Sequence, residues 1–329
     1  MRRFLHAMVE AERLEVATPP LSPHYAIRQS RLPASIARLV VPLNQDDSST
    51  AAFIDECVHT SPPRCWKSYA AACLRVCFSV TTANGAVGRG QMHVLSTAQL
   101  RTILLAVRST QPPSTKSSRR QRLLDVGAGD GTVTAQLAPL FDEVVTTEVS
   151  SSMARSLRAR RWRCVQTADL AELLPSEAGR YDVVTLLNLL DRCSQPRALL
   201  TAAKTLLAPD GVLLIAVVLP FEPFVERGPC KLRPAERLPI LARDFEGAVA
   251  EIVRDVLAPA GLAARVVSRV PYLCKGDMTS KYYVISDAIV ACVISDADDN
   301  AANALEGDAL LHSHHHSPAS LHFSRTGAG

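Results

Sequence analysis

From residue 122 onward, short apolar segments alternate with helical segments, and this alternation constrains the fold more than any other feature of the sequence. Periodicity predicts, in chain order, a strand at 122–126, a helix at 132–140, a strand at 143–149, a helix at 151–160, strands at 163–166 and 181–187, a helix at 197–207 and a strand at 212–219. Strands joined by single helices form a parallel sheet covered on both faces. We therefore predict an α/β fold with a doubly wound, mostly parallel sheet.

Two more strands complete the pattern. A helix expected at 245–257 is followed by strands at 264–270 and 282–294, which only a loop separates. Strands joined by a short loop pair antiparallel, so we expect a hairpin at one edge of the sheet. The prediction is thus a seven-stranded, Rossmann-like sheet.

Composition divides the chain into four regions. Residues 1–50, with scattered prolines and little periodicity, are expected to form a flexible arm. Residues 51–110 are expected to be a helical extension packed on the next domain, with one helical pattern near 69–80 and another that begins at Ser96. The α/β domain follows over 111–294, and the polar, His-rich residues 295–329 are expected to be a disordered tail.

Composition also excludes several classes of protein. A hydrophobic fraction of 47% and a charged fraction of 21% exclude a disordered or fibrous chain. The net charge of +4 is too small to favour nucleic acid or an anionic membrane as a partner. The longest apolar run, 212–221, is far shorter than the roughly 20 residues of a spanning helix. We therefore expect no nucleic-acid partner and no membrane span.

Cysteine usage bears on the compartment. The nine cysteines include no Cys-x-x-Cys pair, which disfavours a zinc ribbon or a dithiol redox motif. Scattered thiols favour an intracellular, reducing compartment, the cytoplasm first. We expect no signal peptide, because Glu10 and Glu12 interrupt the basic start of the chain; an endomembrane or mitochondrial association stays open.

Histidine is absent from the predicted α/β domain. Of the nine histidines, none lies between Val94 and Leu311. A catalytic site in that stretch therefore has no Ser-His-Asp triad, no imidazole base and no His-ligated metal of its own. We expect no metal site.

A glycine-rich segment, 124–131, follows the first predicted strand directly and precedes a helix. Glycines there let the backbone approach a ligand and leave helix N–H groups directed at it. The spacing Gly-x-Gly-x-Gly differs from the nicotinamide fingerprint Gly-x-Gly-x-x-Gly, and Asp125 would repel a pyrophosphate but accept from an amino group. The methionine part of S-adenosylmethionine carries both a carboxylate and an amino group. The expected loop ligands are Gly127, Ala128, Gly129 and Gly131.

Two further acids follow the next two strands. Glu148, which ends the second strand, is placed to accept from both ribose hydroxyls, and Asp169, just past the third, is placed to accept from the adenine amino group. Three acids at three successive strand ends predict S-adenosylmethionine as the cofactor.

The fourth strand is followed by Asn188 and Asp191. Ligands of doubly wound sheets bind at the carboxyl ends of the strands, so both side chains are expected to face the methyl group of the cofactor, which Asn188 also contacts.

Five segments carry a family resemblance when they are taken in order. They are Gly-Arg-Gly-Gln-Met at 88–92, Gly-Ala-Gly-Asp-Gly at 127–131, Leu-Asn-Leu-Leu-Asp-Arg-Cys at 187–193, Leu-Pro-Phe-Glu-Pro-Phe-Val-Glu at 219–226, and Pro-Tyr-Leu-Cys-Lys-Gly-Asp-Met at 271–278 with Tyr-Tyr-Val at 282–284. Together they resemble the DREV family, also called the methyltransferase-like protein 9 family, over roughly residues 50–294. The second segment is common to many methyltransferases, whereas the other four are distinctive.

The resemblance implies a protein-histidine methyltransferase that modifies the Nδ1 (pros) nitrogen in His-x-His motifs with a small middle residue. By motif position, Asn188 and Tyr283 would hold the target imidazole, and Asp191 would stabilise the charge that moves onto the ring or pair with Arg192. A neutral imidazole already offers a lone pair at neutral pH, so transfer needs alignment more than a strong base. The substrate then supplies the missing histidine.

Other interpretations stay open. One is a methyltransferase of a small molecule or nucleic acid, although the Arg-rich stretch 155–163 has only Trp162 as an aromatic and resembles a solvated face. Another is a metal-binding or scaffold protein that acts through its His-rich tail. The tail segment His312-Ser313-His314 is itself a His-x-His motif, so the enzyme's own tail is a further candidate substrate.

Overall fold

The computed structural model describes residues 20–59, 73, 83, 87–88, 90–111, 120–276 and 280–295. The chain divides into two units, Met1–Ile294 and Ser295–Gly329, and every element named below belongs to the first. The helix expected near 69–80, apart from Cys73, and the tail expected beyond Ser295 lie outside the described residues. Within the described ranges, no helix combines the length and apolar character needed to cross a bilayer.

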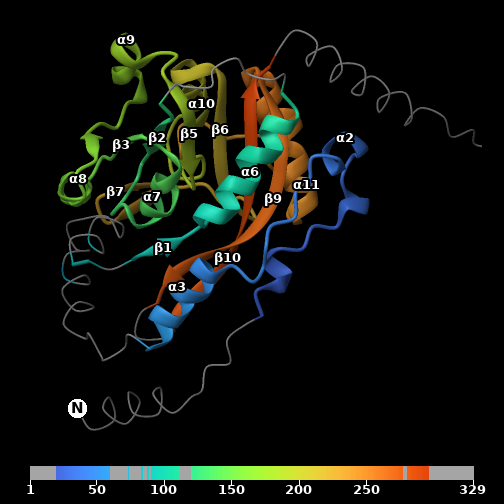
Figure 1. Ribbon diagram of the computed structural model, residues 1–329, viewed down its shortest axis with the longest axis horizontal. Helices are drawn as coiled ribbons and strands as arrows, with labels where there is room; N and C mark the ends of the chain where they lie inside the picture. Colours follow the sequence, from blue (N-terminus) through green and yellow to red (C-terminus); the bar gives the residue numbers. More distant parts are fainter. Residues whose placement is uncertain are drawn as a thin grey trace, which may run out of the picture. The chain divides into compact units, whose positions relative to one another are not determined.

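An eight-stranded sheet forms the centre of this unit, in the order β1-β9-β10-β6-β5-β2-β3-β4 (Figure 1). Its strands are β1 Met92–His93, β2 Arg122–Val126, β3 Glu143–Thr147, β4 Arg163–Val165, β5 Tyr181–Leu187, β6 Leu207–Leu219, β9 Leu262–Lys275 and β10 Tyr282–Ile294. The strands β2 to β6 pair parallel, and β10 runs antiparallel to both β6 and β9. The doubly wound, mostly parallel sheet and its terminal hairpin are therefore confirmed.

The sheet has one strand more than the seven predicted. The additional strand, β1, consists of Met92 and His93, which pair with Cys274 and Leu273 of β9. A strand of two residues has no periodicity in the sequence. Its pairing with the long strand β9 could therefore be found only in the structure. A separate ribbon is formed by β7 Val225–Arg227 and β8 Cys230–Leu232.

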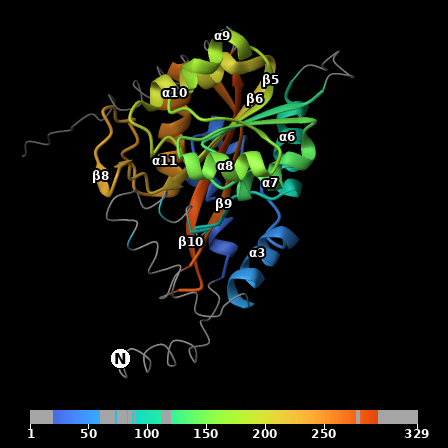
Figure 2. The same cartoon turned by 90° about the vertical axis from the view of Figure 1, so that its left-hand side faces the viewer.

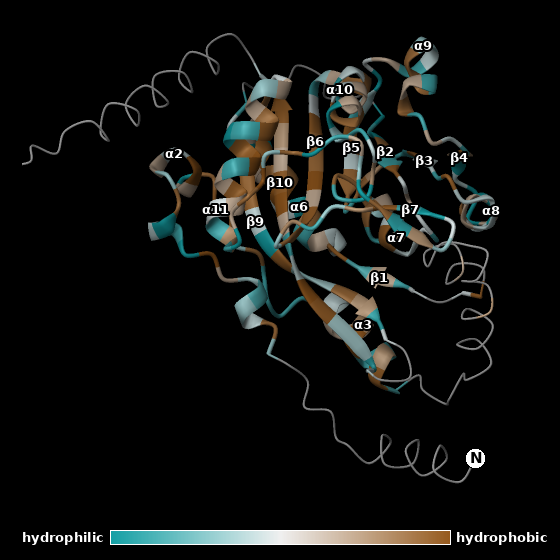
Figure 3. Cartoon of the chain, turned by 180° about the vertical axis from the view of Figure 1, so that it is seen from behind, coloured by the Kyte–Doolittle hydropathy of each residue, from teal (hydrophilic) through white to brown (hydrophobic). Residues whose placement is uncertain are grey.

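Helices cover both faces of the sheet (Figure 2). Along β6, Leu213 and Ile215 belong to one buried cluster, and Leu214 and Ala216 to the other. Because side chains alternate along a strand, the two clusters lie on opposite faces. Figure 3 shows how apolar β6 and β10 are, as befits strands buried on both faces. The first cluster includes residues of α10 Pro196–Leu206, α11 Phe245–Glu251 and the π-helix Ile252–Leu257, and the second includes residues of α6 Thr97–Ser109 and α7 Thr132–Leu137.

The expected flexible arm is wrong for residues 20–50. Tyr25, Leu32 and Ile36 are buried in the two core clusters, and Val40 forms a parallel bridge with Val267 of β9. The prolines break this segment into short elements, so its apolar residues dock singly and show no period. These elements are Ser22–His24, Gln29–Arg31 and α2 Ala34–Ala37.

Two helices flank the part of the extension that the structure does not describe. The first, α3 Ser48–His59, begins within the residues assigned to the arm. The second, α6, begins after Ser96 as predicted, with a capping box in which Ser96 accepts from the Gln99 backbone and Gln99 accepts from the Ser96 backbone. Asp47 joins the two, since it accepts hydrogen bonds from Thr50 and Ser96.

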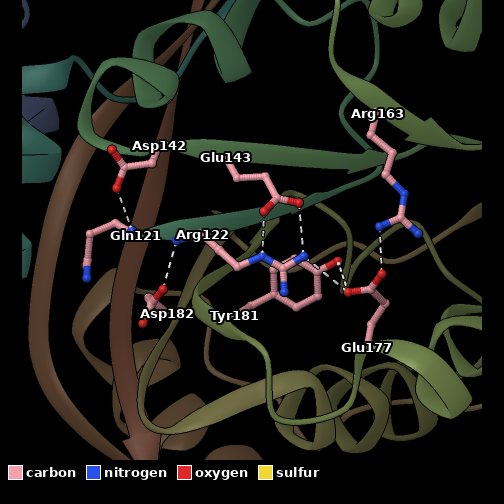
Figure 4. Close-up of polar contacts among 8 residues, drawn as sticks. All are labelled: Gln121, Arg122, Asp142, Glu143, Arg163, Glu177, Tyr181 and Asp182. Atoms are coloured by element: carbon pink, nitrogen blue, oxygen red, sulfur yellow. Dashed lines mark hydrogen bonds and ion pairs between the residues drawn. The ribbon is translucent and has the colours of Figure 1, made fainter. Parts of the chain in front are cut away.

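An ion network closes the N-terminal edge of the parallel strands (Figure 4). Arg122, Glu143 and Arg163 are the first residues of β2, β3 and β4, and Glu177 ends α9 Leu174–Glu177. Glu177 accepts from Arg163 at 2.6 Å and from Arg122 at 3.3 Å, and Arg122 donates to Glu143 at 2.9 Å. Tyr181, first in β5, donates to Glu177. Parallel strands place their first residues at one edge of the sheet. Charged residues at the first positions of β2, β3 and β4 therefore lie close enough to one another to form this network.

Candidate functional site

The glycine loop between β2 and α7 lies at the opposite, C-terminal edge of the strands. Gly127, Gly129 and Gly131 all have positive φ, at 66°, 58° and 80°. A Cβ atom on Gly127 would lie 2.7 Å from the Leu189 side chain, and one on Gly131 would lie 2.8 Å from Trp162. A Cβ on Gly129 would meet no atom of the described chain within 4 Å. Gly127 and Gly131 are therefore needed for packing, whereas Gly129 leaves the loop open to a ligand.

Glu148 follows β3 and is bound to the glycine loop. Its carboxylate accepts from the backbone N–H of Gly129 at 2.9 Å and from that of Ser150 at 2.8 Å. It is only partly buried, and Val149 beside it has 64% of its surface exposed. A carboxylate, an apolar side chain and an open loop thus meet at two adjacent strand ends, and the cofactor contacts of Glu148 and the loop stay a prediction.

Asp125 lies beneath the loop. Its two oxygens accept from the hydroxyls of Thr134 at 2.5 Å and Thr185 at 2.6 Å, and only 3% of the residue is exposed. Burial raises the pKa of its carboxyl, against the effect of the two hydroxyls. The expectation that Asp125 takes the amino group of a ligand is therefore not supported by this geometry. Asp125 instead ties β2 to α7 and β5.

Two other polar groups complete this side of the site. Asp169 is exposed past β4, where its carboxylate accepts from the backbone N–H of Ala171 and caps the short helix Leu170–Leu173. The hydroxyl of Thr132, first in α7, is buried without a hydrogen-bond partner among the described residues. Sequence reasoning missed Thr132, although a threonine at a helix N-terminus after a glycine loop is a recognisable signal.

Asn188 directly follows β5 and has the unusual φ of +56°. Its backbone N–H donates to the Ala216 carbonyl of β6, and its side-chain Nδ2 donates to Oδ2 of Asp287 at 2.8 Å. The other amide atom, Oδ1, is buried without a partner in the described part of the chain. A strained backbone and an unsatisfied acceptor at one residue are typical of ligand sites.

Asp191 lies three residues further on and is 1% exposed. Burial raises the pKa of its carboxyl to about 6, although Arg192 counteracts this. Arg192 pairs with one carboxylate oxygen and lies 4.0 Å from the ring centre of Phe224, whereas Oδ1 has no partner among the residues described. The pairing with Arg192 that the sequence left open is thus present, and one oxygen remains for a ligand.

Asp287 belongs to the site, although the sequence did not predict it. It lies within β10, opposite Val270 and Val218 of the two neighbouring strands, and is completely buried. Burial raises the pKa of its carboxyl to about 8, and the Asn188 amide opposes this effect. One acid within an otherwise apolar strand was the available signal.

Tyr283 lies on the same face of β10 as Asp287, because side chains two or four residues apart share a face. It is 43% exposed. Four residues of strand separate the two by about 13 Å. The structure thus brings Asn188, Asp191 and Asp287 together, and Tyr283 stands further out along the strand.

Comparisons with known proteins agree on the class of the domain. A family model described as DREV methyltransferase matches residues 24–295. A ubiquinone biosynthesis O-methyltransferase of Xanthomonas axonopodis pv. citri (strain 306) is 26% identical over 102 residues, which are 30% of this chain and 43% of that protein. Its counterpart from Cereibacter sphaeroides (strain ATCC 17029 / ATH 2.4.9) is 29% identical over 101 residues, 30% of this chain and 41% of that protein. The chain therefore spans less than half the length of these curated relatives.

Solved structures were compared as well. The crystal structure of the trans-methyltransferase CalH complex with SAH is 21% identical to this chain, with a TM-score of 0.36 and coverage of 53% of this chain and 51% of the other.

Proposed function

The chain belongs to the DREV methyltransferase family, and we propose on this premise that it methylates the Nδ1 (pros) nitrogen of histidine in His-x-His motifs with a small middle residue. S-adenosylmethionine is its methyl donor. The observation that carries the proposal is a set of three buried side-chain oxygens without hydrogen-bond partners in the described chain, one each on Asn188, Asp191 and Asp287, of which those of Asn188 and Asp191 are acceptors at neutral pH. An imidazole that donates N–H and becomes a cation on methylation matches such a set.

The residues at the glycine loop fit the cofactor. The loop is open at Gly129, the Thr132 hydroxyl lacks a partner in the described chain, and Glu148 is accessible beside it. We infer that the loop and α7 hold the methionine part, that Glu148 accepts from the ribose and that Asp169 accepts from the adenine amino group. The exposed Val149 offers apolar surface next to Glu148. When bound, the cofactor supplies an electrophilic methyl group on a sulfonium.

The chain's own residues then act mainly by alignment and charge. Asn188 Oδ1 accepts the N–H of the imidazole, which leaves the lone pair of the other ring nitrogen for methylation. Tyr283 holds the substrate further out along β10. Asp191, with a pKa of about 6, is mostly ionised at neutral pH and stabilises the positive charge that develops on the ring.

A peptide assay tests this function. Purified protein is incubated with labelled S-adenosylmethionine and a His-x-His peptide, a shuffled peptide and a single-His peptide, and the methylhistidine isomers are separated after acid hydrolysis. We expect label only as the pros isomer and only with the His-x-His peptide. Label in the tele isomer, or equal label in the shuffled peptide, would contradict the proposal.

A small-molecule acceptor is the second candidate, because the curated relatives are named as O-methyltransferases of ubiquinone biosynthesis. The matched stretch covers only 30% of this chain. Phenolic acceptors in the same assay distinguish the two. Methyl transfer to a phenol at a rate above that to the peptide would favour this second candidate.

The chain's own tail is a further proposed substrate, through His312 and His314. These residues lie outside the described part of the chain. Intact mass after incubation with S-adenosylmethionine, followed by peptide mapping, would show one or two added methyl groups on the tail peptide.

A further inference from the structure

Asp287 is a costly residue to keep in the centre of a sheet. It is 0% exposed, it lies in β10 between β6 and β9, and the four residues that follow it, Ala288–Ala291, are all buried and apolar. Burying a carboxyl group without full hydrogen bonding destabilises the folded state. A buried acid of this kind, close to a ligand site, is a candidate for function.

The described contact of Asp287 with the site is its hydrogen bond with Asn188. Asn188 Nδ2 donates to Asp287 Oδ2 at 2.8 Å, and Oδ1 of Asp287 has no hydrogen-bond partner in the described chain, while the charges of Asp191 and Arg192 act on Asp287 through space. An amide has a donor end and an acceptor end, which a half-turn about its last bond exchanges. With its NH₂ group held by Asp287, Asn188 directs Oδ1, which has no partner among the residues described, away from Asp287.

We propose that Asp287 is a positioning residue that fixes the Asn188 amide with its oxygen toward the methyl acceptor, so that the site accepts only an imidazole that donates N–H to Asn188. This inference rests on the proposed function. An imidazole bound in this way carries its hydrogen on Nε2 and its lone pair on Nδ1. With Nδ1 toward the methyl group, Asp287 thereby selects the tautomer whose lone pair is on the nitrogen to be methylated, without touching the substrate.

A flipped amide would have the opposite effect. Its NH₂ group would donate to a ring nitrogen and favour the tautomer whose hydrogen is on the nitrogen to be methylated. That tautomer has no lone pair for the methyl group. Loss of Asp287 should therefore impair the turnover step and leave binding of the cofactor alone.

Substitution of Asp287 tests the proposal. Asp287→Asn keeps an acceptor for Asn188, whereas Asp287→Leu and Asp287→Ala remove it. We expect both apolar variants to lower kcat on the His-x-His peptide at least ten-fold with unchanged affinity for S-adenosylmethionine. Asp287→Asn should keep more of kcat. A kcat equal to that of the wild type in the folded apolar variants would overturn the proposal.

A double-mutant cycle distinguishes a positioning role of Asp287 from a purely structural role. If Asp287 acts through Asn188, Asp287→Leu should add less than a two-fold loss of kcat in an Asn188→Ala background. Losses that multiply in the double variant would contradict the inference. Glu177→Leu is the matched control, because Glu177 is a buried acid at the other edge of the sheet. It should lower stability without a comparable loss of kcat in the folded protein.

A substrate analogue supplies a second test. A peptide whose target histidine already carries a methyl group on Nε2 keeps the Nδ1 lone pair but has no N–H for Asn188. We expect the wild-type protein to methylate it at least ten-fold more slowly than the unmodified peptide. Equal rates would show that Asn188 does not require an N–H.

A measurement without substrate keeps the two proposals distinguishable. In ¹⁵N-labelled protein, the side-chain NH₂ signal of Asn188 is identified by its loss in Asn188→Ala. Its protons should exchange slowly in the wild type and in Asp287→Asn, and rapidly in Asp287→Leu and Asp287→Ala. If exchange follows this pattern and the peptide is not methylated, the amide is positioned as inferred and the proposed function fails. If the peptide is methylated and exchange is equal in all four proteins, the inference on Asp287 fails.

Discussion

Both edges of the parallel strands bury carboxyl groups, but the pKa of these groups is shifted in opposite directions at the two edges. At the N-terminal edge, burial alone would raise the pKa of Glu177, but Arg163 and Arg122 lower it below its ordinary value, and both of its oxygens are bonded. At the C-terminal edge, burial raises the pKa of Asp191 and Asp287, and each retains an oxygen without a partner in the described chain. A fully paired acid stabilises the fold, whereas an acid with an unused oxygen is available to a ligand.

The comparison predicts the largest effect at Asn188. Asn188→Ala should lower kcat on a His-x-His peptide about 100-fold, because the imidazole loses the group that aligns it. Affinity for S-adenosylmethionine, measured by calorimetry, should stay within about two-fold, since the loop and Glu148 are untouched. Tyr283→Phe is the milder companion, since only the hydroxyl is removed. Unchanged turnover in both variants would remove these residues from the site.

The next effect is on stability, at the other edge. Glu177→Gln should lower the free energy of unfolding by about 2 kcal/mol, because the partly buried Arg122 loses one of its two charged partners. The exposed position of Arg163 limits the loss. Urea denaturation measures it, and turnover at a temperature where the variant is folded should match the wild type. A catalytic defect in the folded variant would contradict the distinction between an N-terminal edge that stabilises the fold and a C-terminal edge that serves function.

A smaller effect is expected at the cofactor loop. Glu148→Ala should weaken the affinity for S-adenosylmethionine about ten-fold, as expected for loss of a charge-assisted hydrogen bond of about 1.4 kcal/mol. Glu172→Ala is the control, since Glu172 is an exposed acid on the short helix beyond β4. By contrast, Asp125→Ala should act first on stability, because Asp125 contacts Thr134 and Thr185. Calorimetry that shows equal affinity in Glu148→Ala and wild type would overturn the assignment of Glu148.

The last effect is a pH dependence of stability without substrate. Folded Asp287 keeps its proton up to about pH 8, whereas an unfolded Asp loses it near 4, so the folded state binds more protons between these values. Stability therefore falls as pH rises, by at most about 1.4 kcal/mol per pH unit for one group. Asp287→Asn should reduce this slope most clearly between pH 7 and 8, where Asp191, with a pKa of about 6, is mostly ionised and Glu177, with its lowered pKa, does not titrate. Parallel stability curves for variant and wild type would show that Asp287 is ionised in the fold.

Much of the fold could be predicted because its signals are local. The bounds of β2 and β5 agree with the predicted 122–126 and 181–187, and the cap at Ser96 and the glycine loop were read from neighbouring residues. The docking of residues 20–50 could not be predicted, because its contacts, such as the bridge between Val40 and Val267, join positions more than 200 residues apart. The strand β1 was missed for a similar reason, since Met92 pairs with Cys274, 182 residues further along the chain.

The sequence by itself determined the order of strands and helices, the glycine loop and the acid that follows β3, because each depends on residues next to one another in the chain. Only the tertiary structure decided the roles of the acids. It placed Asp125 under two hydroxyls, and it brought Asp287 to Asn188 from 99 residues away. The physical reason is that the charge and hydrogen bonding of a carboxyl depend on its burial and partners, which neighbouring sequence does not encode.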